Sequence, residues 1–254
     1  MRFENITLKK ALGQHFLRDE HICRKIVEAL RQGPLTQLLE IGPGAGALTK
    51  YLLQLEQLPF KAVEIDREKV AYLLHTYPQI EGKLIAEDFL EMEPPFEGRF
   101  SVVGNFPYNI STQILFKILD WRQKVDVMIG MFQKEVALRI AAKEGNKTYG
   151  VLSVLVQAFF KVEYLFEVHE QCFYPPPKVK SAVIRLIPRQ EPLQARSEKD
   201  FFLLVKTAFN QRRKTLRNAV KGLFPADVLQ TPIFSKRAEA LTVSDFMTLT
   251  HAMK

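Results

Sequence analysis

Four consecutive residues near the middle of the chain, Asn105-Phe106-Pro107-Tyr108, combine an amide, a proline and an aromatic side chain. They follow the apolar run 100–104, which has the composition of a buried strand. An asparagine carbonyl can accept a hydrogen bond from a planar amino group, and a tyrosine ring can stack on a base. Proline makes the turn rigid and leaves no backbone N–H to compete. The order of these residues predicts a site that holds the amino group of a nucleobase while a group is transferred to its nitrogen.

The chemistry expected at this site depends on how the amino nitrogen is held. The exocyclic nitrogen of adenine is a poor nucleophile because its lone pair is delocalised into the ring. The side-chain carbonyl of Asn105 and a backbone carbonyl near Phe106 can each accept one N–H, which favours a pyramidal nitrogen with a free lone pair. Catalysis would then depend on positioning and electrostatics, without a metal or a histidine base. The alternative for an Asn-x-Pro-Tyr sequence is a simple turn.

A second motif lies upstream, the glycine-rich sequence Leu39-Glu40-Ile41-Gly42-Pro43-Gly44-Ala45-Gly46. Glycines in the turn between a first strand and a helix let the backbone approach a ligand closely. The spacing differs from the dinucleotide pattern G-x-G-x-x-G, and Pro43 removes an amide that a pyrophosphate could use. Gly42 and Gly44 are therefore expected to contact a methyl donor rather than NAD. A tight turn without a ligand is the alternative.

Two acidic residues at expected strand ends complete the donor site. Glu64 ends the second strand, where an acidic residue holds ribose hydroxyls in nucleotide-binding α/β folds. Asp88 ends the third strand, where its carboxylate could accept a bond from an adenine amino group, with Phe89 beside the ring. Each acid alone could be a solvated helix cap, and Asp66 lies close to Glu64. The ordered set predicts S-adenosylmethionine, held in one crevice outside the carboxyl ends of the strands.

Strands and helices have to alternate to bring these motifs together. Asp19 is a candidate cap for the first helix. The patterns predict helices at 19–30, 47–58, 67–76 and 110–121, and strands at 37–41, 60–65, 83–86, 100–104 and 125–132. This alternation indicates an α/β fold with a parallel sheet and helices on both faces.

The C-terminal part of the chain follows a different pattern. Residues 151–160 form an apolar run that fits either a strand or a buried helix. Residues 180–187 predict a late strand, and strands close together in sequence are usually antiparallel. The polar stretch 188–197 fits a linker, and residues beyond it show helical patterning. We therefore expect a catalytic domain of residues 1–188 and a small helical domain of residues 189–254.

Composition excludes some classes of protein. The chain has 254 residues, of which 47% are hydrophobic and 25% are charged, as in ordinary globular proteins. No apolar run approaches the roughly 18 residues that cross a bilayer, and the first residues lack the apolar core of a signal peptide. Cys23 and Cys172 are the two cysteines and fit neither a disulfide framework nor a zinc site. We expect a cytoplasmic, monomeric protein without a membrane partner or a bound metal.

Charge is distributed unevenly along the chain. The formal net charge is +8, and residues 189–254 hold 12 basic and 6 acidic residues, a net of +6. A basic end indicates a polyanionic partner, with colloidal solubility as the alternative.

Seven segments of the sequence resemble those of the ribosomal RNA adenine dimethyltransferases that modify small-subunit rRNA. This family is related to the erythromycin-resistance methyltransferases and to the eukaryotic dimethyladenosine transferases. The segments span nearly the whole chain, and the last two are the most specific. They are residues 9–17, 39–46, 64–66, 87–88, 105–111, 173–183 and 209–216.

The resemblance implies a role for each motif. Residues of the first segment would close over the methionine end of the donor, and Phe173 would stack on the flipped target adenine opposite Tyr108. The motifs and the resemblance together predict that the catalytic residues are Asn105, Phe106, Pro107, Tyr108 and Phe173. They give as cofactor contacts Gln14, His15, Leu17, Gly42, Gly44, Glu64, Ile65, Asp88, Phe89 and Asn105.

The resemblance also implies a fold, and the sequence departs from the family pattern at two positions. The fold is a Rossmann-like class I methyltransferase sheet of seven strands, one of them antiparallel, followed by a small all-helical domain, with residues 151–160 as a helix. His15 stands where many members have Asn, and Phe106 where many have Leu. A loop histidine is the alternative for His15, and a core aromatic is the alternative for Phe173.

A cluster of basic residues is expected to contact RNA phosphates. Its members are Lys178, Arg212, Arg213, Lys214 and Arg217, and a solvated basic helix is the alternative. The implied activity is dimethylation of N6 on two adjacent adenosines near the 3′ end of 16S rRNA, within the small subunit or its precursor. Methylation of large-subunit rRNA, or less so of DNA adenine, and a mainly non-catalytic role in ribosome assembly remain as alternatives.

Overall fold

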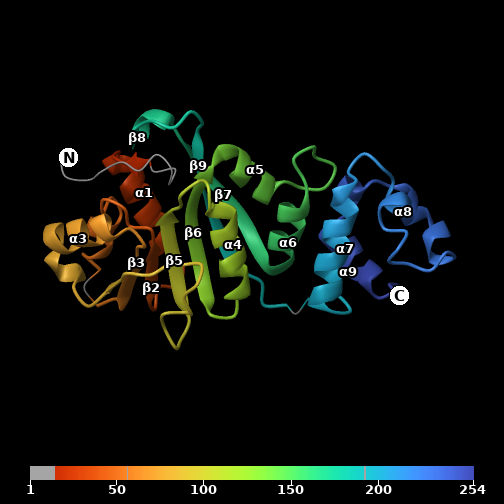
Figure 1. The fold of residues 1–254 in the computed structure, drawn as a ribbon, viewed down its shortest axis with the longest axis horizontal. Helices are drawn as coiled ribbons and strands as arrows, with labels where there is room; N and C mark the ends of the chain where they lie inside the picture. Colours follow the sequence, from red (N-terminus) through yellow and green to blue (C-terminus); the bar gives the residue numbers. More distant parts are fainter. Residues whose placement is uncertain (1–14, 56, 192) are drawn as a thin grey trace. The chain divides into compact units, whose positions relative to one another are not determined.

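The computed structural model describes residues 15–55, 57–191 and 193–254 (Figure 1). By contacts the chain divides into two compact units. The first contains the residues up to Ala137 together with Glu163–Pro188, and the second contains Leu138–Val162 and Arg189–Lys254. Residues 138–162, expected in the catalytic domain, group with the C-terminal residues because their helix packs against C-terminal helices.

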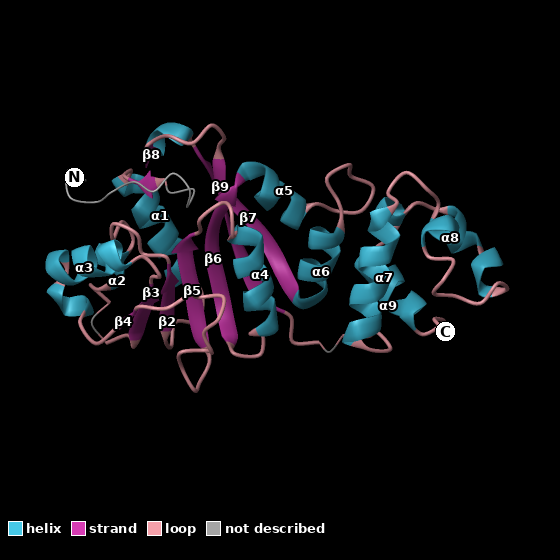
Figure 2. Cartoon of the chain, viewed as in Figure 1, coloured by secondary structure: helices cyan, strands magenta, loops and turns pink. Residues whose placement is uncertain are grey.

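A seven-stranded sheet runs in the order β4-β3-β2-β5-β6-β9-β7 (Figure 2). Neighbours from β4 to β6 pair in parallel, whereas β9 pairs antiparallel with β6. The expected α/β fold and the late antiparallel strand are confirmed. The strands are β2 (Leu38–Ile41), β3 (Phe60–Val63), β4 (Leu84–Ile85), β5 (Phe100–Asn105), β6 (Val125–Gln133), β7 (Phe160–Val168) and β9 (Ser181–Pro188).

Helices of the first unit begin where the sequence provides caps. Asp19 accepts a bond from the backbone N–H of Ile22 and starts α1 (Glu20–Arg31), as expected. Asp66 accepts from Glu68 and starts α3 (Arg67–Thr76). The apolar stripe of α1 joins alternate residues of β6 in one core, which fixes this helix on one face of the sheet. The remaining helices of this unit are α2 (Thr49–Leu52) and α4 (Ser111–Asp120), whereas α5 (Lys134–Ala141) begins in the first unit and ends in the second.

The expected helix at 47–58 is wrong in length, because α2 covers only Thr49–Leu52. After Leu53 the backbone N–H groups of Gln54, Leu55 and Leu58 each donate to the residue three positions earlier. These are turn bonds rather than α-helical bonds. Leu58 also precedes a proline, which disfavours helical backbone angles at that position.

A second, two-stranded sheet joins the start of the described chain to a late segment. In it, β1 (Phe16–Leu17) pairs antiparallel with β8 (Phe173–Tyr174), with Phe16 opposite Tyr174 and Leu17 opposite Phe173. Leu17 and Phe173 lie in the hydrophobic core that contains α1. This pairing positions the residues beside β1 for the site described below.

The second unit is helical, as expected for residues beyond 197. The ambiguous stretch 151–160 is a helix over most of its length, α6 (Val151–Phe159), which confirms that expectation. It packs against α7 (Glu198–Asn210) and α9 (Val243–Thr250), and α8 (Leu216–Ala219) packs against α7. None of the described helices is long and apolar enough to cross a bilayer.

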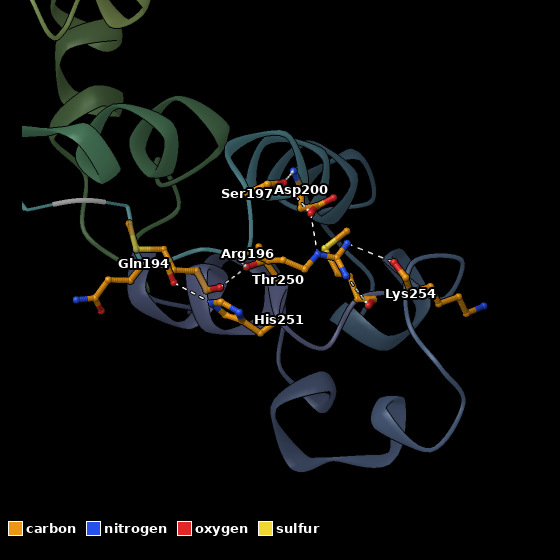
Figure 3. Close-up of polar contacts among 9 residues, drawn as sticks. Gln194, Arg196, Ser197, Asp200, Thr250, His251 and Lys254 are labelled. Atoms are coloured by element: carbon orange, nitrogen blue, oxygen red, sulfur yellow. Dashed lines mark hydrogen bonds and ion pairs between the residues drawn. The ribbon is translucent and has the colours of Figure 1, made fainter.

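One polar cluster ties the start of α7 to the end of the chain (Figure 3). The Arg196 guanidinium donates to Asp200, to the carbonyl of Met253 and to the carbonyl of Lys254. Ser197 caps α7 by accepting from the backbone N–H of Asp200. Arg196 lowers the pKa of the Asp200 carboxyl to about 2, with help from the Ser197 hydroxyl. The linker is therefore anchored to the helical unit itself.

Candidate methyl-donor and base-acceptor site

A cavity of about 260 Å³ lies at the carboxyl ends of β2, β3 and β5. Its volume is close to the lower end of the range for ligand pockets, about 300–1,000 Å³. Most of the residues expected to bind a cofactor or a base line it together. They are His15, Leu17, Gly42, Gly44, Glu64, Ile65, Asp88, Phe89, Asn105, Phe106, Pro107 and Tyr108. Gln14 lies outside the described residues.

The glycine loop between β2 and α2 depends on left-handed backbone angles. Gly42, Gly44 and Gly46 have φ values of 65°, 59° and 81°, which other L-residues rarely adopt. A Cβ added to Gly46 would lie 2.3 Å from Cε2 of Tyr77, so a side chain there would have to displace the Tyr77 ring or the loop. A Cβ on Gly42 would meet nothing nearer than Cδ of Pro107, at 3.9 Å. The backbone at Gly42 is therefore open to a ligand on the cavity wall.

Glu64 is held by two backbone amides. Its Oε2 accepts from the N–H of Gly44 at 3.2 Å, and its Oε1 accepts from the N–H of Asp66 at 3.0 Å. The carboxylate is only 5% exposed and lines the cavity. Acceptor oxygens fixed between the glycine loop and the start of α3 suit a ligand that donates hydroxyl bonds.

The far end of the donor side has a carboxylate beside apolar surfaces. Asp88 Oδ1 accepts from the N–H of Leu90 at 2.9 Å, which fixes the side chain while Oδ2 can accept from a ligand. The Phe89 ring packs edge-on against Trp121, with centroids 5.1 Å apart. Ile65 also lines the cavity and is 59% exposed. A flat base with an amino group fits apolar walls that flank one carboxylate.

Glu40 is a cavity residue to which the sequence alone assigned no role. It is 1% exposed, and its Oε2 accepts from the Thr49 hydroxyl at 2.7 Å. Burial raises the pKa of the Glu40 carboxyl to about 8, and the nearby Glu64 charge acts in the same direction. The sequence did contain one signal for this residue, because Glu40 is the acidic residue two positions before the first glycine of the motif.

Asn105 at the end of β5 is oriented by the chain beside β1. Its Nδ2 donates to the backbone carbonyl of His15 at 3.2 Å. A carbonyl oxygen can only accept, so the amide must present its NH₂ group to His15. The Oδ1 atom is then left to accept a bond from a ligand. This is the orientation that a clamp for an amino group requires.

Phe106 occupies a hollow made by two glycines. Gly104 of β5 pairs with Gly130 of β6, and a Cβ on either would lie 2.5 Å from the Phe106 ring. The ring is 1% exposed and packs edge-on against Phe132, with centroids 5.2 Å apart. Its backbone N–H donates to the carbonyl of Met131. The turn after β5 is thus pinned to the sheet by this side chain.

Tyr108 is fixed by groups from both ends of the first unit. Its hydroxyl is hydrogen-bonded to Ser181, the first residue of β9, and burial raises its pKa. The His15 ring lies 5.5 Å from the Tyr108 ring, tilted by 31°. Nδ1 of His15 lies 2.8 Å from the carbonyl oxygen of Pro175 and therefore donates to it. One side of the cavity consequently depends on contacts among three separate chain segments.

Phe173 is placed differently from the other expected catalytic residues. It is 1% exposed, belongs to the core that contains α1, and is not among the residues that line the cavity. Tyr174, its neighbour in β8, is 46% exposed. In the described arrangement the Phe173 ring has to leave the core before it can stack on a base.

The expected RNA-binding residues fall into two groups. Arg212 donates to Glu239 and to the carbonyl of Lys147, and Arg217 donates to the carbonyl of Leu229. These two side chains therefore make contacts within the second unit. Arg212, Arg213 and Lys214 of the second unit and Lys178 of the first are exposed, and of these Arg212 is engaged with Glu239. Among the described residues there is no group of three or more His, Cys, Asp or Glu side chains that could hold a metal.

Sequence comparisons with known proteins give matches over nearly the whole chain. A family model described as "Ribosomal RNA adenine dimethylase" matches residues 5–253. The chain is 50% identical to "Ribosomal RNA small subunit methyltransferase A" of Cytophaga hutchinsonii, with 98% of each chain covered. It is 49% identical to the protein of the same name in Flavobacterium johnsoniae, over 99% of this chain and 97% of that one.

Two solved structures have a similar fold. A dimethyladenosine transferase from Plasmodium falciparum has a TM-score of 0.76 and 27% identity, and the match covers 92% of this chain and 96% of that one. The 23S rRNA methyltransferase ErmE has a TM-score of 0.69 and 24% identity, over 93% of this chain and 99% of that one. The second likeness concerns the fold alone.

Proposed function

We infer that this chain, which belongs to the family of ribosomal RNA adenine dimethylases, methylates N6 of two adjacent adenosines in a loop near the 3′ end of 16S rRNA. The methyl donor is S-adenosylmethionine, and the substrate is the small subunit or its precursor. The observation that carries this proposal is the orientation of Asn105, whose NH₂ group is used by His15 and whose Oδ1 remains to accept.

The cavity residues fit S-adenosylmethionine. Open backbone at Gly42 leaves room for the ligand, Glu64 offers fixed acceptors for ribose hydroxyls, and Asp88 offers one for an adenine amino group. The residues that would hold the methionine end include His15 and Leu17. When bound, S-adenosylmethionine supplies an electrophilic methyl group.

The clamp for the target nitrogen has two acceptors. Oδ1 of Asn105 is one. The carbonyl of Pro107 already accepts from the N–H of Ile110 at 3.2 Å, which leaves the carbonyl of Phe106 as the second. Two acceptors on one amino group pull both N–H bonds to one side and expose the nitrogen lone pair. A nitrogen that already carries one methyl group has a single N–H left, so one acceptor is unpaired during the second transfer.

Asn105→Ala tests the clamp. We expect methyl transfer to unmethylated small subunits to fall about 100- to 1,000-fold, as when one preorganised polar contact to the reacting group is lost. The affinity for S-adenosylmethionine, measured by calorimetry, should change much less. Asn109→Ala is the matched control, since Asn109 also lines the cavity but makes no side-chain hydrogen bond among the described residues. Transfer that stays within fivefold of the unaltered protein in Asn105→Ala would refute the mechanism.

The same assay identifies the substrate. Labelled methyl groups should enter small subunits, and digestion should release N6,N6-dimethyladenosine. Large subunits serve as the comparison, and labelling of large subunits alone would assign the chain to the alternative substrate. A catalytically dead Asn105→Ala variant that still supports subunit maturation would separate an assembly role from methylation.

Exposed basic residues of the helical unit are proposed to contact RNA phosphates. Arg213 and Lys214 are exposed, whereas Arg212 is engaged with Glu239. Replacing Arg213 and Lys214 by Ala should weaken binding to small subunits and reduce the salt dependence of binding by about two charges. Arg212→Ala should instead lower the stability of the helical unit. An unchanged salt slope in the double variant would show that these two residues form a solvated surface.

A further inference from the structure

We propose that Tyr174 is a stacking platform for the nucleotide next to the target adenine. The proposal rests on the function inferred above. It concerns the last residue of β8, which is not among the residues that line the cavity and begins the segment 174–180 that leads to β9.

The strand pairing shows on which side of the ribbon Tyr174 lies. Phe16 of β1 is directly opposite Tyr174 of β8, and residues opposite each other in an antiparallel pair project from the same face. The Phe16 ring lines the cavity and approaches the Gly44 backbone, where an added Cβ would lie 3.4 Å from its Cε1. Tyr174 therefore projects from the face of the ribbon that covers the donor loop, whereas Phe173 projects from the opposite face into the core.

Contacts of the next residue place the end of β8 beside the acceptor side. The Pro175 carbonyl accepts from Nδ1 of His15, and the His15 ring lies against Tyr108. Tyr174 is thus separated by two contacts from the ring expected to face the target base. A target base held in the cavity would leave its neighbour along the strand close to the end of β8, where Tyr174 is 46% exposed.

The segment 174–180 carries basic side chains and is anchored at both ends, which suits the binding of single-stranded RNA. Lys178 and Lys180 are both exposed, and aromatic rings flanked by basic side chains are typical of surfaces that bind single-stranded nucleic acids. The segment is held at both ends, by the β1–β8 pairing and by a bond from the Lys134 N–H to the Lys180 carbonyl at 2.9 Å. The backbone of the segment is therefore anchored beside the cavity at both ends.

Stacking on a neighbour binds the ground state and the transition state equally, so it should affect KM rather than kcat. With unmethylated small subunits as substrate, Tyr174→Ala should raise KM about tenfold, a typical effect of losing one stacked base. Its kcat should stay within about twofold. Tyr174→Phe retains the ring and should leave KM within about twofold of the unaltered protein. Val179→Ala is the matched control, because Val179 is 45% exposed in the same segment and has no ring.

A modified substrate identifies the partner of the ring. Small subunits are reconstituted with rRNA in which one of the two target adenosines is replaced by an abasic residue. KM for the remaining adenosine should rise about tenfold with the unaltered protein and should not rise further with Tyr174→Ala. Calorimetry with S-adenosylmethionine should give the same Kd for Tyr174→Ala as for the unaltered protein, because the ring lies outside the donor site.

Three results would overturn the proposal. The first is an unchanged KM for Tyr174→Ala, and the second is an equal defect in Tyr174→Phe, which would indicate a role for the hydroxyl. The third is an abasic substitution that weakens Tyr174→Ala as much as it weakens the unaltered protein. If the unaltered protein places no methyl groups on small subunits, the proposed function itself fails. Normal methylation together with an unaffected Tyr174→Ala rejects the stacking role alone.

Discussion

The two sides of the cavity are held in place by contacts of very different range. On the donor side, the bonds that fix Glu40, Glu64 and Asp88 join residues 9, 20 and 2 positions apart. On the acceptor side, Asn105 and Tyr108 are held by residues 90 and 73 positions away. His15 is held by a residue 160 positions away.

Because of this difference, the two sides of the cavity depend on different parts of the fold. The donor side requires β2, β3, β4 and the turns that follow them, since its bonds lie within neighbouring elements. The acceptor side forms only when β1, β8 and the start of β9 have docked. We therefore expect substitutions on the donor side mainly to lower the free energy of unfolding. Substitutions on the acceptor side should mainly lower the rate of methyl transfer.

Gly46→Ala should give the largest effect, on the donor side. The new Cβ would collide with Tyr77 in a residue whose φ is 81°. Left-handed strain and overpacking together should lower the free energy of unfolding by about 2–5 kcal/mol, measured by urea denaturation. Gly82→Ala is the matched control, because Gly82 has a φ of 72° and no atom within 4 Å of an added Cβ. Equal losses in the two variants would show that the Tyr77 contact has no cost.

Glu40→Gln should change how stability depends on pH. The Glu40 carboxyl titrates near its ordinary value of 4.5 in the unfolded chain and at about 8 in the folded chain. Between these values the folded state binds the extra proton, so the free energy of unfolding falls as pH rises, by about 1.4 kcal/mol per pH unit from this group. Above about pH 8 this contribution becomes constant.

The Glu40→Gln variant lacks this group, so denaturation at pH 5.5 and pH 7.5 should show a shallower decline than in the unaltered protein. Glu28→Gln replaces an exposed carboxyl on α1 and should leave the decline as it is. Parallel declines for all three proteins would mean that Glu40 is ionised in the folded state at neutral pH.

Tyr108→Phe and Ser181→Ala test the acceptor side as a pair. Ser181 is fully buried, so either change leaves a polar group without its partner. Each single variant should lose about 1 kcal/mol of transition-state stabilisation, or about fivefold in kcat/KM. The double variant should lose no more than either single one, because the two residues act through one bond. Additive losses would indicate that Tyr108 and Ser181 act independently.

His15→Asn should give the smallest effect, and the His15 variants distinguish the role of the side chain from that of the backbone. The carbonyl that orients Asn105 belongs to the backbone and remains in every variant. His15→Asn keeps a side-chain donor for Pro175 and should stay within about threefold in kcat/KM, whereas His15→Ala should lose about fivefold. An Asn variant as impaired as the Ala variant would assign the role to the ring and its contact with Tyr108.

The difference in contact range also explains which parts of the site could be predicted from the sequence. The glycine motif, Glu64 and Asp88 are visible because strand ends and turn residues are local patterns, and the structure places them along one cavity. The sequence predicts Asn105 as a clamp, but it does not predict the orientation of Asn105 by His15, since no periodicity links residues 90 positions apart. The hollow for Phe106 likewise requires the register between Gly104 and Gly130.

Two further differences have similar causes. The helix expected at 47–58 has an apolar pattern that also fits successive turns, and hydrogen-bond spacing distinguishes them only in the folded chain. Arg212 and Arg217 are indistinguishable from Arg213 by type, yet tertiary contacts occupy the first two. Charge composition predicts a basic surface without showing which cations belong to it.

The antiparallel direction of β9 has a consequence for how such enzymes can diversify. Because β9 runs opposite to β6, with Ser181 beside Gln133, it begins at the edge of the sheet where the parallel strands end. The chain that precedes it, residues 169–180, is thereby delivered to the acceptor side as one continuous insert. Substitutions or length changes in this insert leave the register of the seven-stranded sheet intact, because its one strand, β8, belongs to the separate two-stranded sheet with β1. The residues beside Asn105 and Tyr108 can therefore vary between relatives while β2, β3 and the glycine loop keep their arrangement.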